Sequence, residues 1–297
     1  MNDGPRSGGP GGLVVVDKPG GWTSHDVVAR VRSLAGTRRV GHAGTLDPMA
    51  TGVLVLGVGR ATRLLGHLTL TEKAYTATVR LGEATLTDDA EGEVIATAPA
   101  AGVSDGRITA AVAALTGEIR QVPSKVSAVK IQGRRSYQRV RAGEDVELAA
   151  RPVTVRAFEV GDIRRAGDRT EVDVSVVCSS GTYVRALARD LGAALGVGGH
   201  LTRLRRTRVG PFSLPQARTL GQLEATFDVL PLEEAAAAAF PRRDVGEHEA
   251  KAVTHGGRLP AAGLGPGPVG VFGPDGRFLA LVEEAGGQAR SLAVFAG

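Results

Sequence analysis

The carboxylate of Asp47 is the group in this sequence whose surroundings best suit chemistry. It lies in the loop Gly41–Gly52, and the following Pro48 keeps Asp47 out of the helical region of backbone space. The apolar run Val53–Val58 comes next and predicts a short buried strand. The loop is therefore predicted to present one carboxylate at the edge of a rigid element. The alternative is an Asp-Pro turn in which Asp47 bonds only local amides.

Arg185 is a cation in an unfavourable position. Residues 183–195 carry apolar side chains at helical spacing, which predicts a helix with one buried face. A positive charge in the first turn of a helix is disfavoured by the helix dipole. We therefore expect an anion to face Arg185.

Tyr75 and Lys18 offer chemistry only in combination with other groups. Tyr75 begins a predicted strand over 75–81, where one tyrosine usually packs in the core, although its ring also suits stacking on a base. Lys18 lies between a predicted strand and a helix, where its charge could meet a phosphate or a buried acid. A solvated surface lysine is the alternative.

Two stretches of the chain are rich in lysine and arginine. The first, about 119–150, predicts either a solvated loop and helix or a mobile basic arm that orders on nucleic acid. The second, 201–208, alternates arginines with apolar or small residues and predicts a strand with one cationic edge at a polyanion site, or a solvated edge strand. Their candidate RNA-binding residues are Lys125, Lys130, Arg134, Arg205 and Arg206.

The composition excludes several classes of protein. The net charge of +5 is compatible with a polyanionic partner but is weak support by itself. A single cysteine, Cys178, excludes an internal disulfide and a cysteine-based zinc site, and we expect it in the core. No run approaches the roughly 18 apolar residues of a membrane span. Residues 1–11 are polar, without the apolar region of a secretory signal, and predict a disordered tail on a cytoplasmic protein.

The remaining pattern predicts both helices and strands. Apolar runs predict strands, and apolar periodicity after Thr23 or Ser24 predicts a helix. After Pro241, short apolar runs separated by Gly/Pro turns predict a small β module over 241–297. The other predicted elements are strands at 13–16, 94–95, 153–155 and 172–176 and helices at 60–70, 108–116 (ended by Gly117) and 219–227. Residues 233–240 form an alanine-rich segment that ends at Pro241.

Several motifs together resemble the bacterial tRNA pseudouridine synthases of the TruB family. They occur in the family's order between residue 13 and about residue 230. The matching stretches are Val16–Ser24, Gly41–Gly52, Lys73–Tyr75, Ser127–Lys130, Gly181–Asp190 and Leu204–Thr207. One departure is Leu86, which replaces an acidic residue common in the turn after the Tyr75 strand.

The resemblance implies the pseudouridine-synthase fold. This is an α+β fold with a central mixed, mostly antiparallel sheet flanked by helices and a small C-terminal β domain of PUA-like type. It implies a catalytic domain over 12–240, with the basic arm inserted, and an RNA-binding domain over 241–297. It also implies that no cofactor or metal is needed, and that the protein acts as a monomer without an obligate protein partner.

The resemblance also assigns roles at the site. Asp47 would act at the sugar as nucleophile or base, two routes that the sequence does not separate. Arg185 would keep Asp47 ionised in a dry pocket by lowering its pKa, and Tyr75 would stack on the base and help to take the C5 proton. Tyr183 and Leu204 would wall the pocket, and His42 would fill the gap left by the everted base. Lys18, the basic arm and Arg205–Arg206 would hold phosphates.

The implied activity is isomerisation of the T-loop uridine at position 55 of tRNA to pseudouridine, after the base is flipped out. Two alternatives remain open. One is a protein that binds or folds tRNA without chemistry, which would use the same basic residues but would not need Asp47, Arg185 and Tyr75 together. The other is a synthase of the same superfamily that acts on another RNA.

Overall fold

The computed structural model describes residues 11–124, 130–131, 134–135 and 148–295, and of the two short internal pieces only the backbone. The tail 1–10 and Lys125 lie outside the described residues, as do the side chains of Lys130 and Arg134. The chain forms two compact units. Unit 1 comprises Met1–Asp47, Gly52–Thr69 and Gly210–Gly297, and unit 2 comprises Pro48–Thr51 and Leu70–Val209. This division cuts across the predicted catalytic domain, so the boundaries 12–240 and 241–297 stay a prediction.

Unit 1 contains a small antiparallel sheet built on the two most apolar runs of the chain. Strand β1 (Gly12–Lys18) pairs along its whole length with β3 (Thr51–Val58), and every residue from Val53 to Val58 is buried. The neighbouring strands are β2 (Val40–Ala43) beside β3 and β14 (Leu230–Pro231) beside β1. The expected strands at 13–16 and 53–58 are confirmed.

Helix α1 (Ser24–Ala35) begins where the sequence predicts it. Thr23 is the N-cap: its side chain accepts from the Asp26 amide, and the Asp26 side chain accepts from the Thr23 amide. This reciprocal capping box satisfies two of the amides that a helix start leaves unbonded. Gly36, in a left-handed conformation with φ 61°, ends the helix.

Short helices complete this part of unit 1. The predicted helix at 60–70 is in fact a 3₁₀ turn, η1 (Gly59–Leu64), followed by one turn of α-helix, α2 (Leu65–Thr69). The later elements are β13 (Phe212–Ser213), η2 (Leu214–Gln216), α6 (Leu220–Ala225) and α7 (Leu232–Ala239).

The C-terminal module of unit 1, Arg242–Phe295, is a five-stranded sheet with one helix, as the Gly/Pro-punctuated sequence predicts. The strand order is β15–β17–β18–β19–β16, with β15 parallel to β17 and the other pairs antiparallel. Its elements are β15 (Arg242–Asp244), α8 (Glu247–Thr254), β16 (Leu259–Pro260), β17 (Pro268–Phe272), β18 (Phe278–Ala285) and β19 (Gln288–Val294). Within unit 1, Arg60 and Arg63 of η1 donate to the main-chain carbonyls of Phe295 and Val294.

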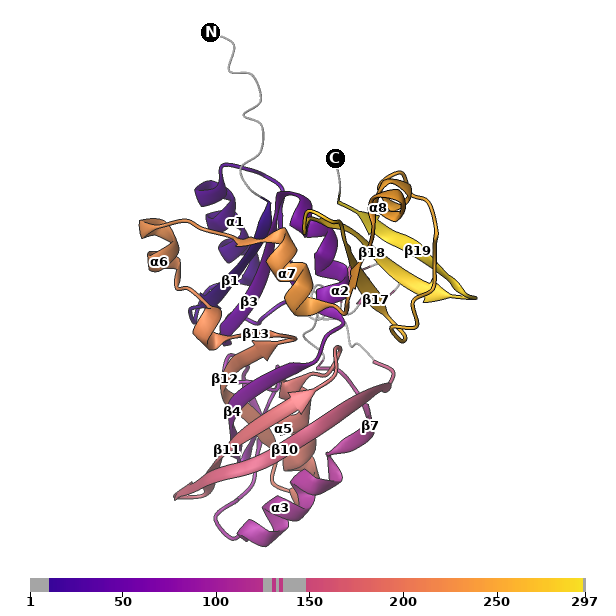
Figure 1. The fold of residues 1–297 in the computed structure, drawn as a ribbon. Helices are drawn as coiled ribbons and strands as arrows, with labels where there is room; N and C mark the ends of the chain where they lie inside the picture. Colours follow the sequence, from indigo (N-terminus) through magenta and orange to yellow (C-terminus); the bar gives the residue numbers. More distant parts are fainter. Residues whose placement is uncertain (1–10, 125–129, 132–133, 136–147, 296–297) are drawn as a thin grey trace. The chain divides into compact units, whose positions relative to one another are not determined.

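Unit 2 is built on a five-stranded antiparallel sheet in the order β12–β4–β11–β10–β7 (Figure 1). The strands are β4 (Lys73–Leu81), β7 (Gly117–Gln121), β10 (Arg151–Ala166), β11 (Arg169–Cys178) and β12 (Gly199–Val209). In β11 residues alternate between buried and half-buried, as the alternating sequence predicts. Cys178 at its end is buried, as expected.

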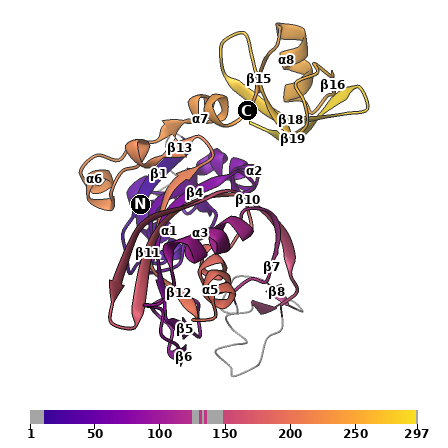
Figure 2. The same ribbon diagram turned by 90° about the horizontal axis from the view of Figure 1, so that it is seen from below.

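Two helices of unit 2 lie side by side near one face of this sheet, α3 (Asp105–Ala114) and α5 (Val184–Leu195) (Figure 2). Helix α3 is capped by Ser104 and ends before Leu115, so Gly117 does not terminate it as predicted but instead opens β7. The smaller pairs are β5 (Glu83–Thr85) with β6 (Val94–Thr97), and β8 (Lys130–Ile131) with β9 (Arg134–Arg135).

Helix α5 is held close to the start of β12. A Cβ on Gly192 would lie 2.1 Å from the main-chain carbon of Gly198 and 2.1 Å from the nitrogen of Gly199. Only glycine fits at this contact, because the atoms in the way are backbone. The last turns of α5 are therefore fixed against the sheet, and the site described below depends on where its first turn begins.

None of the helices in the described part of the chain is long and apolar enough to cross a membrane.

Candidate active site

The Asp47 loop in unit 1 is anchored one residue before the carboxylate. The Oγ of Ser24, the first residue of α1, donates to the Leu46 carbonyl at 3.1 Å and accepts from the Leu46 amide at 2.9 Å. Both Ser24 and Leu46 are buried, while Asp47 itself is half-buried. Gly44, with φ 85°, provides a turn that a residue with a Cβ rarely adopts. Ser24 therefore fixes the residue before Asp47, a contact that the sequence did not indicate. Whether Asp47 bonds only local amides stays open.

His42 lies on β2, five residues before Asp47, and is half-buried. Its ring meets the ring of His25 edge to face, with 5.8 Å between centroids and 86° between planes. Its predicted role of filling the gap left by the base stays a prediction.

Lys18, the last residue of β1, is completely buried. Its Nζ donates to the carbonyls of Pro19 and Trp22 at 2.8 and 2.6 Å. The ammonium group therefore fixes the turn between β1 and α1. This position does not suit the expected phosphate contact, and the alternative of a solvated lysine is wrong.

In unit 2, Tyr75 lies on the buried side of β4, in register with Val176 of β11 and Arg206 of β12. Arg206 is only 1% exposed, which makes it one of the largest fully buried side chains of the chain. Arg206 therefore does not lie on a solvated edge strand, and burial argues against its expected contact with RNA phosphates. Leu204, paired with Ala77, is also buried, whereas Arg205 is half-buried and donates to Thr51 Oγ1.

Lys73 lies two residues before Tyr75, so both side chains leave the same face of β4. It is buried, and its Nζ donates to the Thr71 carbonyl at 2.9 Å. Burial, reinforced by the positive charge of Arg206, lowers the pKa of Lys73 to about 8. Burial also raises the pKa of the neighbouring Cys178 thiol to about 11, which keeps that thiol protonated at neutral pH.

Arg185 is buried in the first turn of α5, and a carboxylate of its own unit lies beside it. Its Nε lies 3.5 Å from Oδ2 of Asp89, with both side chains at most 5% exposed. Its Nη1 donates to the Thr87 carbonyl at 2.7 Å. The expected anion therefore exists, and in unit 2 it is Asp89. Pairing of Arg185 with Asp47 stays a prediction, because Asp47 belongs to unit 1.

The next turn of α5 repeats this arrangement with Arg189. Its Nη1 lies 3.3 Å from Oδ2 of Asp88, which is largely buried and has a positive φ of 61°. Burial raises the pKa of Asp88, while hydrogen bonding and the two arginines oppose that shift. Two consecutive aspartates thus face two arginines spaced one helical turn apart.

The sequence contains a signal for this network. Asp88 and Asp89 stand together in a stretch read only as an acidic turn, and Arg185 and Arg189 are four residues apart on a predicted helix. Leu86, where the resemblance calls for an acid, is exposed, and the carboxylates come from the next residues of the turn.

Comparison with known proteins identifies the family of this chain. Residues 32–184 match the family described as TruB family pseudouridylate synthase (N terminal domain). Residues 185–236 match the tRNA pseudouridylate synthase B C-terminal domain, and residues 240–296 match the tRNA Pseudouridine synthase II, C terminal. The chain belongs to the TruB family.

Individual relatives agree with this assignment. The chain is 66% identical over 292 residues to tRNA pseudouridine synthase B of Streptomyces griseus, covering 97% of this chain and 98% of the relative. It is 62% identical over 290 residues to the protein of the same name from Thermobifida fusca, covering 96% and 99%. As a member of this TruB family, the protein is a pseudouridine synthase and therefore an isomerase.

Solved structures confirm the predicted α+β pseudouridine-synthase fold. A Cbf5–Nop10–Gar1 complex contains a chain with a TM-score of 0.71 and 28% identity, covering 96% of this chain and 84% of that one. An H/ACA RNP bound to a substrate RNA containing 2′-deoxyuridine contains one with a TM-score of 0.70 and 27% identity, covering 96% and 85%.

The TruB reaction breaks a C–N glycosidic bond, turns the base and forms a C–C bond, with no net redox change. Among the described residues, no group of three or more histidine, cysteine, aspartate or glutamate side chains is arranged to hold a metal ion. The Asp47 carboxylate is half-buried, and the Arg185 guanidinium and the Tyr75 ring are buried. Their roles in the reaction stay predictions.

Proposed function

We propose that this TruB protein converts the T-loop uridine at position 55 of tRNA into pseudouridine. The observation that carries the choice of RNA is the 66% identity to a protein named tRNA pseudouridine synthase B, which extends over 97% of the chain. We further propose that it works as a monomer in the cytoplasm, without an obligate protein partner or a cofactor.

In the proposed mechanism Asp47 attacks the sugar or removes a proton from it while the glycosidic bond breaks. A carboxylate in a pocket from which RNA excludes water must stay ionised, and a nearby guanidinium favours the ionised form. Arg185 is suited to this task because it is buried and held by Asp89 and Thr87.

Tyr75 would receive the everted base on its ring and help to remove the proton from C5 after the new bond forms. Flipping a base costs a few kcal/mol, and stacking on an aromatic ring returns about 1–3 kcal/mol. Tyr183 and Leu204 would form the walls of the pocket, and His42 would occupy the space that the base leaves in the RNA.

Phosphate contacts are proposed for the exposed or half-exposed cations. Arg205 is half-buried on β12 and is a better candidate than the buried Arg206. Lys125, Lys130 and Arg134 are proposed to bind RNA within the basic arm. The C-terminal module offers exposed cations that include Arg258, Arg277 and Arg290, which fits an RNA-binding role.

The test is to incubate the protein with an unmodified tRNA transcript and to map pseudouridine along it. Product at the T-loop uridine alone is expected, and product at another site or in another RNA would favour the alternative substrate. Asp47→Asn should abolish product and keep tRNA affinity, whereas the matched surface variant Asp228→Asn should retain full turnover. A wild-type protein that binds tRNA but makes no pseudouridine would favour the non-catalytic alternative.

Phosphate contacts are tested by measuring tRNA affinity against salt concentration. Each neutralised phosphate releases condensed counterions, so the logarithm of the binding constant should fall linearly with the logarithm of salt. Arg205→Ala should make that slope shallower and Arg206→Ala should not. A slope near zero for the wild type would contradict the proposed phosphate contacts.

A further inference from the structure

The start of α5 is bonded to a side chain that none of the site assignments uses, that of Gln121. Its Oε1 accepts from the amide of Tyr183 at 2.8 Å, and its Nε2 donates to the carbonyl of Tyr183 at 3.1 Å. Gln121 is the last residue of β7 and is only 2% exposed. One amide side chain therefore satisfies both main-chain groups of Tyr183 inside the unit.

This double contact replaces an ordinary helix cap. Tyr183 occupies the N-cap position of α5, and its own side chain makes no capping hydrogen bond. Its carbonyl accepts from the Leu187 amide at 3.2 Å and so starts the helical hydrogen-bond series. Because Gln121 holds both the amide and the carbonyl of that residue, it fixes the place and direction in which α5 begins.

A second contact ties the same end of β7 to the next turns of the helix. Nη2 of Arg189 donates to the carbonyl of Val122 at 2.7 Å, while Nη1 of the same side chain faces Asp88. The helix is thus bonded to adjacent residues of one strand end at positions 183 and 189. Arg185 lies between these two points and is bonded to Thr87 and Asp89.

We propose that Gln121 is a positioning residue for the isomerisation: it sets the main chain of Tyr183 and the first turn of α5, and through them the guanidinium of Arg185. The inference rests on the role proposed above for Arg185. An amide side chain is required because the site needs one donor and one acceptor at fixed places. A carboxylate or an aliphatic side chain of the same length cannot supply both.

The decisive variant is Gln121→Glu, which keeps the shape and makes the contact dependent on pH. A protonated carboxylic acid can donate to the Tyr183 carbonyl and accept from its amide, as glutamine does. The ionised carboxylate has no proton to donate and would face a carbonyl oxygen. Turnover of this variant should therefore be near that of the wild type at low pH and fall as the new carboxyl group ionises.

Charged groups on the surrounding elements are the same in the variant and the wild type, so the ratio of the two activities isolates the new carboxyl group. The arginines keep their charge throughout the pH range used, and burial of the new group favours its neutral form. The groups on these elements include Glu118 and Arg120 on β7, Arg151 on β10, Asp88 and Asp89 in the turn, and Arg185, Arg189 and Asp190 on α5.

The experiment measures pseudouridine formation under single-turnover conditions between about pH 5.5 and pH 8.5, with saturating tRNA. The ratio of Gln121→Glu to wild-type activity should fall by about tenfold or more as pH rises, since one charge-opposed hydrogen bond is lost. Gln121→Leu should be slow throughout, with tRNA affinity unchanged. The control Gln222→Glu, at an exposed cap where only the side-chain oxygen is used, should follow the wild type.

A second readout does not depend on activity. Hydrogen exchange of the peptide that contains Tyr183 and Val184 should be faster in Gln121→Glu than in the wild type at pH 8, and equal at pH 5.5. The proposal is wrong if the activity ratio and the exchange ratio both stay constant over this range. A wild-type protein without pseudouridine activity would instead reject the proposed function, while the exchange result would still report on the contact.

Discussion

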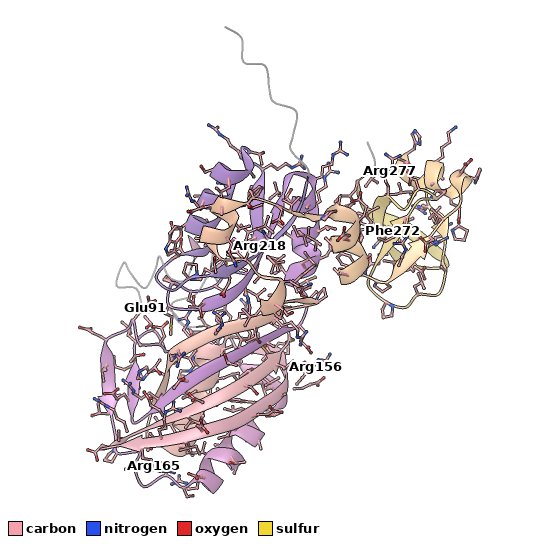
Figure 3. The ribbon with its side chains drawn as sticks, turned by 60° about the vertical axis from the view of Figure 1, so that its left-hand side comes forward. Glu91, Arg156, Arg165, Arg218, Phe272 and Arg277 are labelled. Atoms are coloured by element: carbon pink, nitrogen blue, oxygen red, sulfur yellow. The ribbon has the colours of Figure 1, made fainter. Side chains whose placement is uncertain are left out.

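The ion pairs of α5 and those of the C-terminal module show that the distance between the charged atoms does not by itself decide how much an ion pair contributes. Arg185 and Asp89 are 3.5 Å apart and at most 5% exposed. Arg277 and Asp275 in the C-terminal module are closer, at 2.5 Å, but are 76% and 50% exposed (Figure 3). Water and salt screen the exposed pair. In the buried pair, water cannot take the place of a partner that is removed, so its loss destabilises the protein. Burial therefore marks the pair that can hold a reacting group in place.

The largest effect is expected from Asp89→Asn, which keeps the shape of the buried pair and removes its negative charge. Removing one partner of a buried ion pair costs about 3–5 kcal/mol, and Arg185 would lose one of the contacts that orient it. We expect turnover to fall at least about a hundredfold, with the free energy of unfolding lowered by about 3 kcal/mol in urea titrations.

The matched control for Asp89→Asn is Asp105→Asn in the same unit. Asp105 pairs with Arg165 near one end of β10 (Figure 3), but it is 65% exposed. Its replacement should change neither turnover nor tRNA affinity. If Asp89→Asn and Asp105→Asn lost activity equally, burial would not explain why one ion pair matters for turnover and the other does not.

A second effect, on stability as a function of pH, is expected from Lys73. This lysine is buried, and the charge that affects it most is that of another cation, Arg206. Its pKa is lowered to about 8, below the unfolded value of 10.5. Between these values the unfolded chain binds a proton that the folded protein has released, so this residue makes stability rise with pH. Urea unfolding of the wild type and Lys73→Met at pH 7 and pH 9.5 should show the wild type gaining on the order of 2 kcal/mol relative to the variant. An equal change in both proteins would contradict the lowered pKa.

The sequence predicted elements better than it predicted the partners of charges. Apolar runs and periodicity were sufficient for β1, β3, β11 and α5. The position of Arg185 correctly indicated an anion, because the helix dipole is a local property. The carboxylate of Asp89 could not be chosen from sequence, because it is brought to α5 by a turn that ordinary composition does not distinguish from a solvated loop.

The arginines of β12 show why an alternating pattern can mislead. Regular alternation would put Arg203 and Arg205 on the face of Leu201, and Arg206 on the opposite face, but the register with β4 shifts between Leu201 and Arg203 and again between Arg206 and Arg208. Each irregularity moves the following side chains to the other face. Arg206 is consequently buried beside Tyr75, and the sequence contains no glycine or proline in this stretch to indicate the shifts.

A smaller effect is expected from Ser24→Ala, which removes a buried polar contact without a charge. The amide and carbonyl of Leu46 would lose their partner, and an unsatisfied buried group costs about 1–3 kcal/mol. Turnover should fall by about tenfold, because Leu46 directly precedes Asp47. Thr23→Ala, which removes the exposed cap of the same helix, should cost about 1 kcal/mol of stability with turnover retained. Equal turnover in the two variants would show that the Ser24 contact does not position Asp47.

The smallest effect is expected from Asp275→Asn in the C-terminal module. Hydrogen bonds from Arg277 lower the pKa of Asp275, but the pair lies at the surface. Its contribution is present above the unfolded pKa of the carboxyl group and would be lost as pH falls toward the lower folded pKa. At neutral pH the midpoint of thermal unfolding should shift by less than about 2 °C, and 1 M salt should remove even that difference. A loss comparable to that of Asp89→Asn would mean that the short distance between Arg277 and Asp275, rather than burial, governs the strength of these pairs.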